Sequence, residues 1–239
     1  MEVQLFIPCY IDQLYPETGF NTLKILEKSG CKVKYNPQQT CCGQPAYNSG
    51  YWKEATQLAE KFLTDFQVDT PIVSPSGSCT GYIIHHYGKL ISSDKELTKK
   101  FELMKDNIFE LSDFLINVLK IEKLDAHFPH KVTYHDSCSA LREYGIKEEP
   151  RKLLSMVRGL ELIEMTESET CCGFGGTFAV KNNAISSAMA EKKVRNALET
   201  GAEYIVSTEA SCLMNINGYC KKNNISITGI HLADVLTGV

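Results

Sequence analysis

Short apolar runs recur along the chain and predict its strands. Most of these runs are rich in β-branched or aromatic side chains and are bounded by turn residues, which is typical of strands. The predicted strands are residues 3–8, 33–35, 71–74, 132–134, 160–165 and 204–207.

Helices are predicted between these runs, where apolar side chains recur at three- and four-residue steps and so share one helix face. One such face comprises Trp52, Ala55, Leu58, Phe62 and Phe66, and another comprises Leu97, Phe101, Met104 and Ile108. Gly30 and Gly201 follow helical stretches and suit the left-handed position that ends a helix. Strands that alternate with helices predict βαβ units and a parallel sheet.

The cysteines indicate that one unit occurs twice. The first half carries Cys9, Cys41-Cys42 and Cys79, and the second half carries Cys138, Cys171-Cys172 and Cys212. Corresponding cysteines are 129, 130 and 133 residues apart. Each pair also lies in the same local sequence, Thr-Cys-Cys-Gly. Such a sustained register is the signature of an internal repeat.

We therefore predict an α/β protein of two tandem, pseudo-symmetric units, each with a small, mainly parallel sheet flanked by helices. The first cysteine-rich domain is placed at residues 1–121, a linker at 122–130 and the second domain at 131–239. The repeated cysteines outside the Cys-Cys pairs each follow a predicted strand; they are Cys9, Cys79, Cys138 and Cys212. Because ligands gather beyond the carboxyl ends of strands in open α/β sheets, the cysteines of each unit are expected to converge.

Composition and charge narrow the class of protein. Hydrophobic residues make up 43 % and charged residues 23 % of the chain, which is typical of a globular protein. The formal net charge of -4 argues against a nucleic-acid partner. No transmembrane segment is expected, because no apolar run reaches the ~18–20 residues that a membrane helix needs. Residues 1–9 lack the pattern of a signal peptide, so the expected location is cytoplasmic.

Ten cysteines in a reducing compartment indicate metal binding, redox chemistry or scattered core thiols rather than disulfides, and their regular spacing argues against the last of these. Adjacent side chains in an extended segment point to opposite faces, so adjacent thiolates would chelate a single tetrahedral ion poorly. They could instead reach different irons of one iron–sulfur cluster. Structural zinc sites typically use Cys-x-x-Cys pairs, and this chain has none. The predicted metal ligands are Cys9, Cys41, Cys42, Cys79, Cys138, Cys171, Cys172 and Cys212.

Glycines beside the cysteine pairs are predicted to let the backbone approach the cofactor. They are Gly43 in the first unit and Gly173, Gly175 and Gly176 in the second. Backbone N–H groups that donate to cluster sulfurs would raise the reduction potential. The second run is not typical of a nucleotide-binding loop, because it lacks the G-x-G-x-x-G spacing and a following Lys-Ser or Lys-Thr. If only one unit holds a cluster, its richer glycine loop favours the second.

These motifs resemble the cysteine-rich CCG domain, in which one cysteine, a Cys-Cys-Gly and a Cys-x-x-Cys are separated by gaps of about thirty residues. Proteins with two such domains include the cysteine-rich component of heterodisulfide reductase and the lactate utilization protein A family. The phrases His135-Asp136-Ser137-Cys138 and Ser211-Cys212-Leu213-Met214 look most like the latter. The resemblance implies participation in the oxidation of L-lactate to pyruvate, with other iron–sulfur and accessory subunits as partners.

The chain departs from the complete motif at two positions. Ser76 and Glu209 stand where the first cysteine of Cys-x-x-Cys is expected, so each unit offers four thiolates instead of five. Four thiolates suffice for a [4Fe–4S] cluster, which is the predicted cofactor. We interpret Glu209 as a solvated loop carboxylate rather than as an oxygen ligand.

The remaining candidates are weaker. Cys31 and Cys220 have no counterpart in the other unit and are interpreted as ordinary thiols. The neighbouring pair His85-His86 is predicted to lie on a helix surface, because adjacent helical residues do not share a face. His135 and Asp136 leave two interpretations open, a hydrogen bond or proton transfer at a cluster, or packing at a strand end.

The leading prediction is an iron–sulfur electron-transfer subunit of an oxidoreductase, catalytic together with its partners. No catalytic residue is assigned in this chain. Two alternatives stay open: a component of a thiol–disulfide reductase of the heterodisulfide type, and a structural scaffold protein with zinc in one domain.

Overall fold

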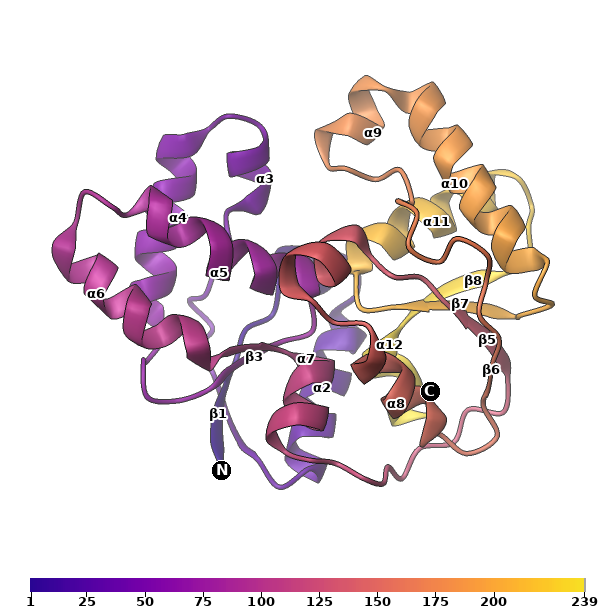
Figure 1. Ribbon diagram of the computed structural model, residues 1–239, viewed down its shortest axis with the longest axis horizontal. Helices are drawn as coiled ribbons and strands as arrows, with labels where there is room; N and C mark the ends of the chain where they lie inside the picture. The colour runs from indigo at the N-terminus through magenta and orange to yellow at the C-terminus, as the bar shows by residue number, and fades with distance from the viewer. Residues whose placement is uncertain (239) are drawn as a thin grey trace.

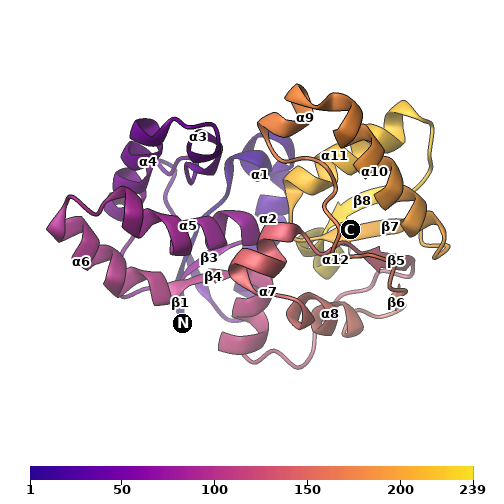
Figure 2. The same cartoon turned by 45° about the horizontal axis from the view of Figure 1, so that its top comes forward.

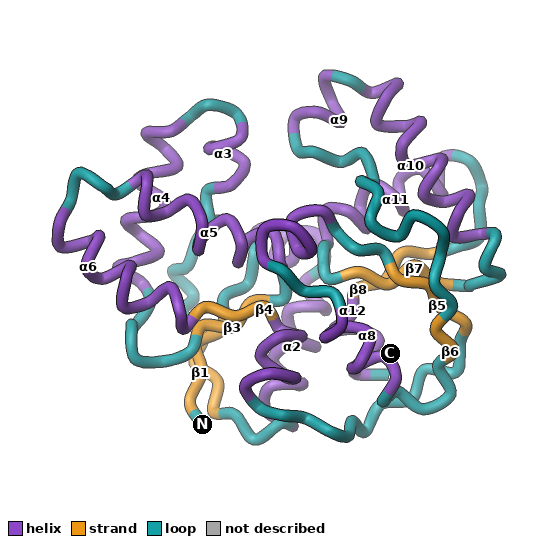
Figure 3. The backbone as a smooth tube through the Cα atoms, in the orientation of Figure 1, coloured by secondary structure: helices purple, strands orange, loops and turns teal. Residues whose placement is uncertain are grey.

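Two parallel sheets organise the chain in the computed structural model, which describes residues 1–238. Figure 1 and Figure 3 show one sheet in each half of the molecule. The first has the order β2-β1-β3-β4, with β1 Glu2–Leu5, β2 Lys32–Tyr35, β3 Ile72–Ser74 and β4 Ile108–Glu110. The second has the order β6-β5-β7-β8, with β5 Lys131–Tyr134, β6 Glu161–Leu162, β7 Tyr204–Ser207 and β8 Thr228–His231. Identical strand orders confirm the predicted α/β fold with two similar units.

Helices flank both sheets. In the first unit they are α1 Cys9–Leu14, α2 Pro16–Lys28, α3 Gln44–Asn48, α4 Trp52–Asp65, α5 Gly77–Leu90, α6 Lys95–Met104, η1 Lys105–Asn107, α7 Leu111–Asp113 and η2 Phe114–Val118. In the second unit they are η3 Ala140–Tyr144, α8 Glu148–Ser155, α9 Thr177–Lys181, α10 Asn183–Leu198, α11 Ala210–Lys222 and α12 Leu232–Thr237. Figure 2 shows α3 with α4 and α9 with α10 as two separate projections on one side of the molecule. Among residues 1–238, no helix is long and apolar enough to cross a membrane.

Some element boundaries differ from the prediction. Ile108, expected on a helix face, begins β4, because α6 ends at Met104 and a short 3-10 turn follows. Trp52 is 65 % exposed at the start of α4 and does not belong to the buried face of that helix. The strand predicted at 160–165 contains only β6. The positive φ angles of Gly30 (82°) and Gly201 (70°) confirm the predicted left-handed residues.

One hydrophobic core joins the two units. Leu5 of β1 and Val132 of β5 belong to the same buried cluster, together with residues of α2 and α12. Thr18 Oγ1 and Asn21 Nδ2 of α2 each donate to the Asp234 carboxylate of α12 at 2.9 Å. The division into two domains with a linker at residues 122–130 stays a prediction. The last residue of the predicted second domain, 239, lies outside the described residues.

Candidate metal centre

The first unit brings its four predicted cysteine ligands together. Cys9 begins α1 after β1, and Cys79 lies in the first turn of α5 after β3. Cys41 and Cys42 lie in the loop between β2 and α3. The Sγ atoms of Cys9 and Cys41 are 3.5 Å apart, and those of Cys42 and Cys79 are 3.3 Å apart. Two strand ends and one loop thus deliver two close thiol pairs.

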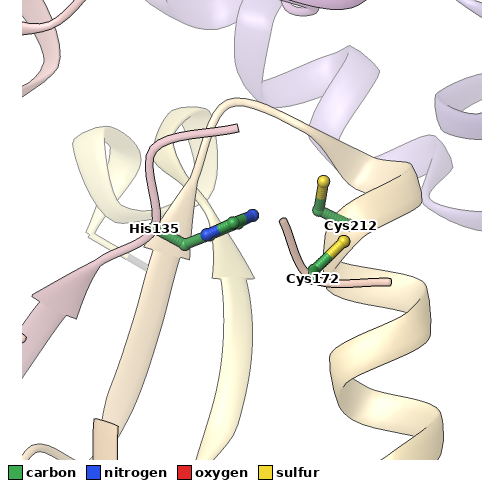
Figure 4. A group of neighbouring side chains, drawn as sticks. All are labelled: His135, Cys172 and Cys212. Carbon is green, nitrogen blue, oxygen red and sulfur yellow. The ribbon is translucent and has the colours of Figure 1, made fainter. Parts of the chain in front are cut away.

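The second unit repeats this arrangement and adds a histidine. Cys138 and Cys171 lie close enough to shift each other's pKa values, and so do Cys172 and Cys212. A ring nitrogen of His135 and the Sγ atoms of Cys172 and Cys212 all lie within 4.8 Å of one another. Figure 4 shows the imidazole reaching from the end of β5 toward both sulfurs. The side chain of His135 therefore faces the cysteines, which is the arrangement that a role at a metal centre requires.

Both cysteine sets open onto one cleft between the units. Its volume is about 340 Å³, and α3 and α9 contribute residues to its opposite walls. All of the predicted cysteine ligands except Cys41 line it. Cys31 and Cys220 instead lie buried in hydrophobic clusters, as expected for ordinary thiols. Cysteines of both units therefore face the same space.

The crowded thiols shift one another's pKa values. Hydrogen bonds from Cys42 and Cys9 lower the pKa of Cys41, whereas its negative sulfur raises the pKa values of those two neighbours. Hydrogen bonds between neighbouring thiols likewise lower the pKa values of Cys171 and Cys212 and raise those of Cys138 and Cys172. A full set of thiolates in either unit therefore requires a cationic centre, and metal binding would release protons.

The predicted glycines shape the loops that carry the cysteine pairs. Gly43 and Gly173 have φ angles of 94° and 89°, and their N–H groups donate to Cys41 Sγ at 3.4 Å and Cys171 Sγ at 3.3 Å. A Cβ on Gly173 would lie 2.6 Å from a backbone oxygen of α10, so no larger residue fits.

The longer glycine loop of the second unit also reaches the cleft. Gly175 and Gly176 line it in the turn before α9, with φ angles of 52° and 61°. Such angles favour glycine, which explains the run locally. Contact of these glycines with a cofactor stays a prediction.

Glu209 is not the solvated carboxylate that we expected. It is 2 % exposed and points across to the first unit. Its Oε1 accepts from the Ser78 backbone N–H at 2.5 Å, and Ser78 Oγ and Ser76 Oγ donate at 2.8 and 3.2 Å. Burial and the nearby charge of Cys212 raise the pKa of Glu209 to about 8. The two departures from the motif, Ser76 and Glu209, thus bind each other between the cysteine sets.

Asp136 is occupied by an ion pair and not by the cysteines. Arg151 donates to both of its carboxylate oxygens, at 2.9 and 2.8 Å, and also pairs with Glu164. Burial works to raise the pKa of Asp136, but Arg151 outweighs it and holds the pKa below its usual value. For Asp136, packing at a strand end is therefore the better interpretation.

Lys193 is a functional candidate that the sequence did not single out. It is 1 % exposed on α10, and its Nζ donates to the carbonyls of Glu167 at 2.6 Å and Ser168 at 3.0 Å. These carbonyls belong to the segment that leads to Cys171. The signal lay in the register of the repeat, which places a lysine in one unit and an apolar residue in the other.

The donor chemistry fits an iron–sulfur centre in each unit. All ten cysteines are free, so every predicted ligand can bind as a thiolate. Two close thiol pairs offer four sulfur donors, which is the number that a [4Fe–4S] cluster takes. The backbone N–H groups of Gly43 and Gly173 already point at sulfur, as they do around such clusters.

Comparison with known proteins agrees with this architecture. The family model of the cysteine-rich CCG domain matches residues 3–84 and 132–217. A solved structure of a hypothetical protein from Helicobacter pylori has a TM-score of 0.64 at 14 % identity. That match covers 98 % of this chain and 48 % of the other, so the chain spans about half of that protein and shares its fold. The fold and cysteine sets define a protein with tandem cysteine-rich CCG domains.

Relatives along the whole chain narrow the class further. Lactate utilization protein A of Halalkalibacterium halodurans is 43 % identical over 236 residues, which cover 99 % of this chain and 96 % of that protein. Lactate utilization protein A 1 of Bacillus mycoides is 44 % identical over 237 residues, with coverages of 99 % and 96 %. The chain belongs to the lactate utilization protein A family.

Proposed function

We propose that this chain is an iron–sulfur electron-transfer subunit that acts in the oxidation of L-lactate to pyruvate. The observation that carries the proposal is the pair of four-thiol sets that share one cleft. The choice of lactate as the substrate rests on the names of the relatives, which are 43 % and 44 % identical along almost the whole chain. Other iron–sulfur and accessory subunits are the proposed partners, and oxidation of the hydroxy acid is assigned to one of them.

The residues of the chain have defined tasks in this proposal. Bound clusters would supply one-electron redox chemistry, and the eight repeated cysteines would hold them. The N–H groups of Gly43 and Gly173 would stabilise negative charge on sulfur and so favour the reduced state. The cleft walls would bring both centres into reach of one electron donor or acceptor.

The first experiment measures iron, acid-labile sulfide and zinc in protein purified without oxygen, with absorption spectra before and after dithionite. We expect about four irons and four sulfides per occupied unit, with a broad visible band that bleaches. Zinc without sulfide would overturn the proposal in favour of the structural scaffold. Metal-free protein with titratable thiols would favour the disulfide reductase.

Substitution of single cysteines assigns the ligands. Cys171→Ser and Cys172→Ser are each expected to remove the second unit's share of iron and visible absorption, because one thiolate of four is lost. Cys31→Ser is the matched control, a buried thiol outside the cleft, and it should retain the metal content of the unmodified chain. Loss of colour in Cys31→Ser alone would show that the ligand set is wrong.

A further inference from the structure

The two cysteine sets have different surroundings although their backbones correspond. Gly43 packs against Ala55 and Leu58 of α4, and Gly173 packs against Ser186 and Met189 of α10. These contacts align the two helices position by position, so that Ala55 corresponds to Ser186 and Leu58 to Met189.

This alignment identifies two further pairs of equivalent positions near the cysteine sets. One helical turn beyond the glycine contact, Phe62 of α4 corresponds to Lys193 of α10. Three residues before the first cysteine of each unit, Phe6 corresponds to His135. In the first unit Phe6 and Phe62 form an edge-to-face pair with ring centroids 5.2 Å apart. Two aromatic side chains in the first unit are thus replaced by two nitrogen-containing side chains, His135 and Lys193, in the second.

Both nitrogen side chains of the second unit meet at one carbonyl. Lys193 Nζ lies 3.0 Å and His135 Nδ1 lies 3.3 Å from the oxygen of Ser168. A carbonyl can only accept, so Nδ1 carries the ring proton and donates it. The buried ammonium of Lys193 on the same oxygen opposes a second positive charge on the imidazole. With the proton on Nδ1, the ring can offer a lone pair on Nε2.

The Nε2 atom lies near the sulfurs of Cys172 and Cys212 but forms no hydrogen bond of ordinary geometry with them. His135 is fully buried, and Nε2 has no hydrogen-bond partner within residues 1–238. A buried polar atom without a partner is costly and calls for an explanation. In Figure 4 the ring nitrogen farther from the backbone points toward Cys172 and Cys212. Metal-ligating histidines show this pattern, with one nitrogen donating to a carbonyl and the other free for the metal.

We propose that His135 is a ligand of the metal centre in the second unit, binding through Nε2 beside Cys172 and Cys212. The identity of that centre as an iron–sulfur cluster rests on the proposed function, whereas the ligation does not. The second unit then offers five donors, one of them neutral, and the first offers only thiolates because Phe6 occupies the equivalent position. A histidine donor raises the reduction potential of a cluster, so the second centre is the more easily reduced one.

Magnetic resonance tests the ligation directly. Pulsed electron paramagnetic resonance of the reduced protein should show hyperfine coupling to a coordinated nitrogen, and ¹⁵N-histidine labelling should change that coupling. His135→Phe, which installs the residue of the first unit, should abolish it. His130→Phe is the matched control, since His130 precedes β5 and pairs with surface-exposed Glu203. The labelling experiment needs no substitution and so stands even if His135→Phe fails to fold.

The potential provides a second readout. In His135→Phe the ratio of reduced to oxidised second centre at fixed solution potential should fall about tenfold, which is 59 mV for a one-electron couple. A histidine that served only packing would leave the nitrogen coupling absent in the unmodified protein. A spectrum without histidine nitrogen in protein that contains iron and sulfide would overturn the ligation and leave the proposed function standing.

Metal-edge X-ray absorption separates the two proposals when the metal differs. If the protein holds zinc without sulfide, the proposed function fails, but a mixed nitrogen and sulfur shell that becomes all sulfur in His135→Phe would still establish the ligand. An all-sulfur shell in the unmodified protein would overturn it. Protein without any bound metal would overturn both.

Discussion

A buried ammonium group lies beside the cysteines of the second unit, where the first unit has Phe62. Lys193 is held by two carbonyls, and burial lowers its pKa to about 8 despite the neighbouring negative groups. At pH 7 the side chain is still mostly cationic. A cation in a buried site stabilises the more negative, reduced state of a redox centre nearby, because screening by water is weak there.

Lys193→Gln removes this charge and keeps an N–H donor for the carbonyls. The ratio of reduced to oxidised second centre at fixed potential should fall about tenfold, or 59 mV for one electron, in a dye-mediated redox titration. Lys192→Gln is the control, because the neighbouring lysine has a half-exposed side chain that pairs with Glu167. Equal potentials in both variants would contradict a role for the Lys193 charge.

The sequence predicted single site residues unevenly. The eight repeated cysteines could be named because their register is fixed by the repeat. The orientation of Glu209 could not, since its partners Ser76 and Ser78 lie 133 and 131 residues away in the other unit. The grouping of His135 with Cys172 and Cys212 likewise depends on three elements that meet only in the folded chain.

At the scale of elements, a buried carboxylate ends β4 and caps α7. Glu110 Oε2 accepts from the backbone N–H groups of Ser112 at 2.7 Å and Asp113 at 3.3 Å. Its Oε1 is buried without a hydrogen-bond partner in the described part of the chain. Burial raises the pKa of Glu110 from 4.5 to about 7.

This carboxylate should make stability depend on pH. A folded pKa above the unfolded one means that the fold binds the proton more tightly, so the contribution is complete below pH 4.5 and is lost as pH rises through about 7. Relative to Glu110→Gln, the wild-type chain should lose on the order of 3 kcal/mol of unfolding free energy across that window.

Urea unfolding at pH 5 and pH 8 measures the difference. Asp94→Asn, at the exposed N-cap of α6, is the charge-matched control and should follow the wild type at both pH values. Parallel pH dependence of Glu110→Gln and the wild type would refute the assignment to Glu110.

Helices and strands were predictable where the local sequence pattern agrees with the packing of the folded chain. All six predicted strands overlap an observed strand, and the paired cysteines lie in loops before helices, as expected. The outer strands β4 and β8 were missed. β4 spans only three residues after a tight turn, and β8 contains Gly229 and exposed positions, so neither has a clear strand pattern. Both form because the neighbouring strand offers them a parallel edge.

At the scale of the whole molecule, the cleft depends on how closely the two units approach. Helix α5, which carries Cys79, packs against η3, which follows Cys138. A Cβ on Gly77 would lie 2.6 Å from the Cβ and 2.9 Å from the Cα of Ala140. A Cβ on Gly81 would meet Glu143 at 3.1 Å. Two glycines one helical turn apart therefore set the distance between the cysteine sets.

Gly77→Ala should force α5 and η3 apart at this contact, which we call the seam between the units. Overpacking of this kind costs about 1–3 kcal/mol, and the shift of α5 should also displace Cys79 and lower the retained iron. Ala140→Gly removes the nearer of the two clashing atoms, the Cβ, but leaves the Cα at 2.9 Å, so the double variant should recover part of the lost stability and metal. Urea unfolding and iron per chain, measured for both single variants and the double variant, give the coupling between the two positions. Additive losses in the double variant would show that the seam yields at low cost, and that the spacing of the two centres is set by the shared core beneath β1 and β5 instead.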